Sequence, residues 1–93
     1  MIKTNINIFN DSELLEILSD LEHERWSHWQ KHLHKLCIEN KDGSLTIPKD
    51  KIIYWQKLFG TPYKDLLEEV KEQDKIQARK TIRIIKKYIT DKK

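Results

Sequence analysis

Residues 12–37 read SELLEILSDLEHERWSHWQKHLHKLC, and this stretch decides the fold. At the roughly 100° per residue of an α-helix, apolar side chains recur on one face of it. They are Leu14, Leu15, Leu18, Leu21, Trp26, Trp29, Leu33 and Leu36. Just before the stripe, Asn10, Asp11 and Ser12 offer side chains that cap helix N-termini. The spacing therefore predicts a helix from about Ser12 to Cys37.

Three polar side chains, Glu22, Arg25 and His32, fall inside this apolar stripe. A buried ion without a partner costs several kcal/mol. Each of these side chains is therefore either neutralised by a second element or placed at the border of a ligand cavity. The pattern predicts a polar recess on the core side of the first helix.

The composition indicates one small domain over residues 1–93. The chain has 93 residues, 38% hydrophobic and 35% charged, so its core must be compact and dimerisation would add buried area. No apolar run approaches the roughly 18 residues of a membrane span, and the start MIKTNIN lacks the apolar stretch of a signal peptide. We expect a cytoplasmic protein that does not enter a membrane. The single cysteine, Cys37, is expected to be a small core residue.

Short elements follow the first helix. Residues 37–39 and 44–47 flank Asn40-Lys41-Asp42-Gly43, whose Asp-Gly pair favours the turn of a short hairpin. Pro48 fits the first turn of a second helix over residues 49–59, and Gly60 fits its end. Thr61-Pro62-Tyr63 is expected to be extended or turned.

A last helix is predicted from about Leu66 to Thr90. Its apolar stripe consists of Leu67, Val70, Ala78, Ile82, Ile85, Tyr88 and Ile89. Asp74 and Thr81 lie at the centre of that stripe, which predicts an ion pair between Arg25 and Asp74 across the helices. The fold class is mainly α: two long antiparallel helices with a short third helix and a short hairpin. Residues 1–10 are expected to be an N-terminal extension and residues 91–93 a frayed tail.

The charge is distributed unevenly. Residues 1–47 hold five Lys and Arg against eight Asp and Glu, a net −3, and residues 48–93 hold thirteen against seven, a net +6, which gives the total of +3. A basic row lies opposite the apolar stripe of the last helix. Its members are Lys75, Arg79, Lys80, Arg83, Lys86 and Lys87. This basic row is either a solvated face or a surface that follows the phosphates of a nucleic acid.

His23 stands three positions before Trp26, and Pro62-Tyr63 is followed by Leu66, Lys71 and Asp74. In this order of residues the chain resembles the ryanodine-receptor-type (RyR) domain, which has a His-x-x-Trp helix and a similar Pro-Tyr, Leu, Lys and Asp order leading into its final helix. Lys75 stands where the family often has Arg. The family's Gly-Trp-x-Tyr-Gly run after the first helix is absent, and residues 52–59 read as an added helix.

The resemblance implies a small stand-alone ligand-binding domain of a bacterial or phage protein, which binds a nucleotide-derived molecule and, in a phage, sequesters a host defence signal. A base would stack on an aromatic ring, and basic groups would meet phosphate or ribose. The expected ligand-binding residues are His23, Arg25, Trp26, Trp55, Tyr63 and Lys71. Arg25 cannot serve fully in both the ligand site and the ion pair, and its first role is expected to be structural.

Other function classes have weaker signals. The sequence contains no Gly-rich phosphate loop and no Gly-x-Ser-x-Gly elbow, and no motif marks Cys37 as a nucleophile. We therefore expect that the protein is not an enzyme and that it binds no cofactor. His28 and His32 have metal-ligand spacing, but a third ligand is not evident, so we expect no metal site. A protein interaction module that self-associates is one alternative function. Nucleic-acid binding through the basic row is the other.

Overall fold

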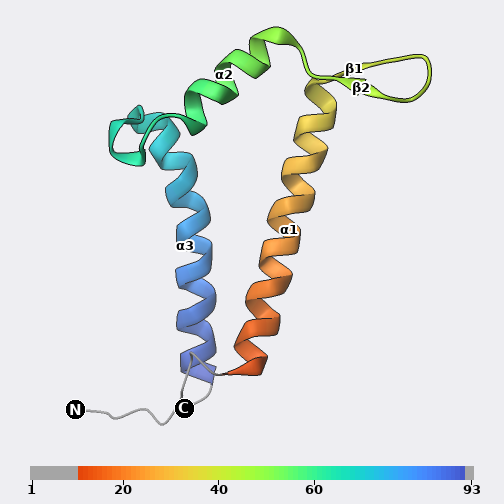
Figure 1. Cartoon of the computed structure of the whole chain (residues 1–93). Coiled ribbons are helices and arrows are strands. Elements are labelled where there is room, and N and C mark those ends of the chain that lie inside the picture. The colour runs from red at the N-terminus through yellow and green to blue at the C-terminus, as the bar shows by residue number, and fades with distance from the viewer. Residues whose placement is uncertain (1–10, 92–93) are drawn as a thin grey trace.

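The computed structural model describes residues 11–91. The predicted N-terminal extension, residues 1–10, and residues 92–93 of the predicted tail lie outside this range. Two long helices, α1 (Ser12–Leu36) and α3 (Glu68–Asp91), run antiparallel, and α2 (Lys49–Phe59) joins their far ends (Figure 1). A two-stranded hairpin projects from the corner between α1 and α2. The prediction of a mainly α fold with a small hairpin is confirmed.

The first helix begins where the sequence predicts. The Asp11 side chain accepts a hydrogen bond from the Leu14 backbone N–H at 3.0 Å, which satisfies one of the free donors of the first turn. The helix ends at Leu36, and Cys37 adopts an extended conformation, half-buried. The predicted boundary at Cys37 is therefore correct to one residue.

The hairpin pairs β1 (Ile38–Glu39) with β2 (Leu45–Thr46) in antiparallel register. Gly43 has a φ of 88°, the left-handed conformation that glycine adopts at no steric cost. The Asp42 carboxylate accepts hydrogen bonds from the Ser44 hydroxyl and backbone N–H, and these bonds lower the pKa of Asp42. The Asp-Gly turn therefore forms at the predicted position.

The second half follows the predicted order, with both ends of the last helix shifted. Its last residue is Asp91, which was predicted to belong to the frayed tail. Pro48 precedes α2 as its N-cap residue, and Gly60 is the residue that ends it. A 3-10 turn at Tyr63–Asp65 and an extended Leu66 then delay the start of the last helix to Glu68, two residues later than predicted. Within residues 11–91, no helix has both the length and the apolar character that a membrane span requires.

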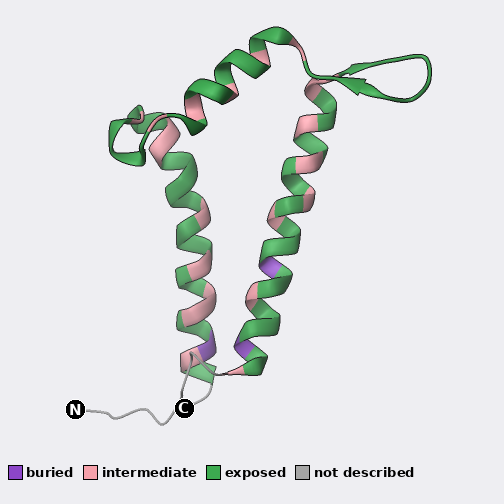
Figure 2. Cartoon of the chain, viewed as in Figure 1, coloured by how far each residue is buried: buried purple, intermediate pink, exposed green. Residues whose placement is uncertain are grey.

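The buried side chains lie in the half of the helix pair where α1 starts and α3 ends. Leu14 and Leu21 of α1 and Tyr88 of α3 are the buried apolar side chains among residues 11–91 (Figure 2). The Tyr88 hydroxyl donates a hydrogen bond to Asp11, the cap of α1, and this bond raises the pKa of Tyr88 to about 12. One carboxylate thus caps α1 and ties it to the last turns of α3. We call this group of four residues the basal clamp.

Outside the basal clamp the helices form an open frame. The Cα radius of gyration is 18.5 Å, whereas a compact chain of 93 residues has about 12 Å. No side chain of residues 11–91 is less than 2% exposed. The stripe predicted as core is therefore only partly covered: Trp29 is 43% exposed, and Glu22 and His32 lie in solvent. The expectation of a compact core is not met, because α3 covers only one edge of the stripe.

Candidate functional site

Arg25 is the polar side chain that joins the middle of α1 to α3. Its Nη2 donates to the Thr81 hydroxyl at 2.7 Å and to the Gln77 backbone carbonyl. Its Nη1 donates to Glu22 at 3.0 Å, and its buried Nε has no partner within residues 11–91. These bonds explain why a cation lies on the core side of the helix. Arg25 has a structural role because both of its terminal nitrogens are engaged.

The expected ion pair between Arg25 and Asp74 is not present in the described part of the chain. Asp74 is exposed, and the neighbours of the guanidinium on α3 are the neutral acceptors of Gln77 and Thr81. The carboxylate that Arg25 contacts is Glu22, one turn earlier on its own helix. The sequence pattern identified the helix that receives Arg25 but not the acceptors, because Asp74 lies two turns away from Thr81.

The other predicted ligand residues meet in separate pairs. The ring of Trp26 stacks on His23, with centroids 6.0 Å apart and planes at 22°. Trp55 of α2 meets Trp29 edge to face at 5.6 Å. Lys71 places its ammonium 5.6 Å from the centre of the Tyr63 ring and 3.5 Å from the Glu68 carboxylate. These three contacts lie apart along the frame and do not gather around one cavity.

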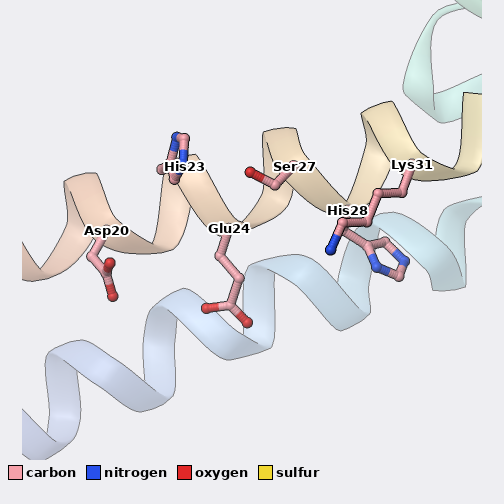
Figure 3. Close-up of a pocket in the computed structure, with 6 residues that line it drawn as sticks. All are labelled: Asp20, His23, Glu24, Ser27, His28 and Lys31. Atoms are coloured by element: carbon pink, nitrogen blue, oxygen red, sulfur yellow. The ribbon is translucent and has the colours of Figure 1, made fainter. Parts of the chain in front are cut away.

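A recess of about 410 Å³ lies along α1. Its lining residues, Asp20, His23, Glu24, Ser27, His28 and Lys31, all belong to this one helix (Figure 3). His23 and Glu24 project in opposite directions in this view. Two carboxylates against one ammonium disfavour a phosphate. Of the predicted ligand residues, His23 alone lines the recess.

The basic row of α3 is exposed at all six positions. Arg79 donates to the Glu72 carboxylate at 2.6 Å, and this ion pair lowers the pKa of Glu72 and raises that of Arg79. A solvent-exposed ion pair of this kind contributes little to stability. Nucleic-acid binding by this row stays a prediction.

The helix pair also exposes apolar side chains. Leu15, Trp26 and Leu33 lie within about 20° of one another around α1, roughly 100° from the line along which α1 meets α3. Leu15 is 63% exposed and Trp26 is 59% exposed. The apolar stripe of α1 is therefore wider than one helical neighbour can cover.

The last helix has a matching apolar flank. Ala78, Ile82 and Ile89 lie roughly 100° from its own contact line in the same rotational sense, and Ile82 is 52% exposed. Because the two helices run antiparallel, flanks that are rotated in the same sense from the contact line lie on the same side of the pair. Both apolar flanks therefore share one side of the frame. Because Arg25 bonds residues 77 and 81, Trp26 lies level with Ala78, and Leu15 lies level with Ile89.

We call this surface the apolar face and define it by Leu15, Trp26 and Leu33 of α1 with Ala78, Ile82 and Ile89 of α3. The sequence pattern predicts all of these side chains as core, whereas Leu15, Trp26, Ala78 and Ile82 are exposed and Leu33 and Ile89 are half-buried. The width of the stripe was the signal that could have found this exposure. The opposite side of the helix pair is polar around Asp20, Glu24 and Lys80.

Comparison with protein-family models, curated proteins and solved structures finds no match to this chain. The resemblance to the RyR domain stays a prediction. Within residues 11–91, no group of three or more His, Cys, Asp or Glu side chains could hold a metal ion. The function proposed below therefore rests on the physical properties of the surface.

The bonds of Arg25 predict which residue of α3 is coupled to it. A double-mutant cycle of Arg25→Met with Thr81→Val is expected to give a coupling energy of about 1 kcal/mol in urea unfolding, because each variant removes one end of the hydrogen bond. The matched cycle of Arg25→Met with Asp74→Ala is expected to give less than about 0.5 kcal/mol. A larger coupling to Asp74 than to Thr81 would contradict this assignment.

Proposed function

We propose that this chain is a non-enzymatic interaction module of the cytoplasm, and that the apolar face is its binding surface. The observation that carries the proposal is the exposure of Leu15, Trp26 and Ile82 on one side of a frame that buries few side chains of its own. Contiguous apolar patches on a protein surface mark sites that bind another protein. A large aromatic ring near the centre of such a patch is the residue type that contributes most to binding.

The contacts that join the two helices beside the apolar face support this proposal. Burial at the basal clamp and the Arg25 bonds hold α1 and α3 together from residue 11 to about residue 25. Binding then requires little ordering of backbone, and this lowers the entropic cost of association. Leu15 and Trp26 lie near opposite ends of this joined segment.

The proposal predicts that the apolar face binds a hydrophobic dye. At low micromolar chain concentration, anilinonaphthalene sulfonate is expected to fluoresce strongly with the wild-type chain. The double variant Leu15→Ser, Ile82→Ser is expected to lose at least half of that signal, because it removes two exposed apolar side chains of the face.

The matched control is Ile17→Ser, Ile76→Ser. These side chains are 37% and 46% exposed but lie outside the apolar face, so this variant is expected to keep most of the fluorescence. An equal loss in both variants, or no fluorescence with the wild-type chain, would refute the assignment of the binding surface.

A small-ligand function is the second proposal, and one observation favours it. Trp26 has an open ring surface beside His23, as base stacking requires, and the resemblance to the RyR domain supports a nucleotide-derived ligand. The separation of Trp55, Tyr63 and Lys71 from this ring makes the proposal less direct. A base on Trp26 would occupy part of the apolar face.

The small-ligand proposal predicts a melting shift with nucleotide second messengers. A ligand present at 100 times its Kd stabilises the folded chain by about 2.7 kcal/mol, which raises the Tm by several degrees. The shift is expected to disappear in Trp26→Ala and to persist in Trp29→Ala. No shift with any adenine, guanine or cyclic dinucleotide would contradict this second proposal.

A further inference from the structure

We infer that the partner of the apolar face is a second copy of this chain, packed about a two-fold axis that runs parallel to α1 and α3. This inference rests on the proposed interaction function and names its partner. In the inferred dimer, α1 of each copy lies against α3 of the other. The two helix pairs then form a four-helix arrangement whose centre is the two apolar faces.

The accessible surface provides enough area for such an interface. A compact folded chain of 11.3 kDa exposes about 5,700 Å², whereas this chain exposes 8270 Å². Full extension of residues 1–10 and 92–93 would raise the surface expected of a compact chain by about 1,500 Å². About 1,000 Å² of excess surface remains on residues 11–91. A stable interface buries about 800 Å² on each partner.

The side-chain composition of the apolar face suits a second copy. In a two-fold interface each surface must complement itself, and aliphatic and aromatic side chains meet this condition without unpaired charge. Leu15 and Trp26 would contact the flank of Ala78, Ile82 and Ile89 on the other copy. Leu15 is level with Ile89 within one chain. A two-fold axis parallel to the helices does not change heights along them, so Leu15 of one copy is also level with Ile89 of the other.

Charge complementarity selects the orientation. Residues 12–24 carry five carboxylates and no Lys or Arg, and residues 75–90 carry six Lys and Arg and no carboxylate. If α1 lies against α3 of the second copy, these acidic and basic halves meet at the rim of the interface. If α1 met α1 instead, about a two-fold axis perpendicular to the helices, the basic half of α3 would lie antiparallel against that of the other copy, which like charges disfavour.

Sedimentation equilibrium of the full chain tests the partner. We expect the mass to rise from 11.3 kDa toward twice this value between about 1 μM and 1 mM. Ile82→Glu is expected to weaken self-association at least tenfold, because it places a charge in the apolar centre. Ile76→Glu is the matched control, since Ile76 is equally aliphatic and 46% exposed on another side of α3, and it is expected to leave the mass profile unchanged.

Mixed single-cysteine chains test the orientation independently of the glutamate variants. In a Cys37→Ser background, a mixture of Leu15→Cys and Ile89→Cys is expected to form a disulfide-linked heterodimer under mild oxidation. Leu15→Cys alone is expected to crosslink at least fivefold less. Preferential crosslinking of Leu15→Cys with itself would overturn the inferred packing, even if the chain is a dimer.

The outcomes separate this inference from the proposed function. A chain that stays at 11.3 kDa up to 1 mM, while its apolar face still binds the dye, overturns the second copy as partner and leaves the interaction function in place. A monomer whose face does not bind the dye overturns both. Equal weakening of self-association by Ile82→Glu and Ile76→Glu would place the interface elsewhere and overturn the inference.

Discussion

The arrangement depends on one constraint: α1 and α3 bury side chains against each other in only one half of the helix pair. Asp11, Leu14, Leu21 and Tyr88 form the basal clamp there, and Arg25 with Thr81 extends the contact to mid-height. Beyond this point α2 holds the far ends of the two helices apart (Figure 1). The helices therefore cannot cover their remaining apolar side chains with each other. Those side chains become a surface.

This constraint changes the meaning of the polar residues in the apolar stripe. A buried cation suggested a ligand recess, but Arg25 uses its donors to connect two helices. The guanidinium meets neutral oxygens on α3 and keeps Glu22 beside it on the solvent side, so its charge is compensated without a buried carboxylate. The polar group thus sets the register of the helix pair. The apolar groups next to it provide the binding surface.

Local sequence signals predicted the elements well because each has a local cause. Asp11 caps the first helix, Gly43 permits the hairpin turn, and Pro48 and Gly60 mark the ends of α2. The delayed start of α3 was not predicted, because the 3-10 turn at Tyr63–Asp65 competes with the α-helix over only a few residues. Periodicity also identified which helix faces are apolar. It could not show how much of a wide stripe one neighbour would cover.

The candidate site was harder to predict from the sequence than the helices and strands were. The residues expected to bind a ligand do form contacts, but Trp26 with His23, Trp29 with Trp55, and Tyr63 with Lys71 are distinct pairs. Convergence on one cavity depends on the angle between helices, which spacing along the sequence does not contain. The identity of Leu15 and Ile82 as surface residues depends on the same angle. The separation of the aromatic pairs and the exposure of the apolar side chains therefore have the same physical origin, the angle between the helices.

The central claim is that a single copy cannot close over its own apolar side chains. Small-angle X-ray scattering at a concentration where the chain sediments as a single copy measures this directly. A radius of gyration close to 18.5 Å is expected for the open frame. A value near the roughly 12 Å of a compact chain of this length would show that the helices fold together and cover the apolar face, and it would contradict the claim.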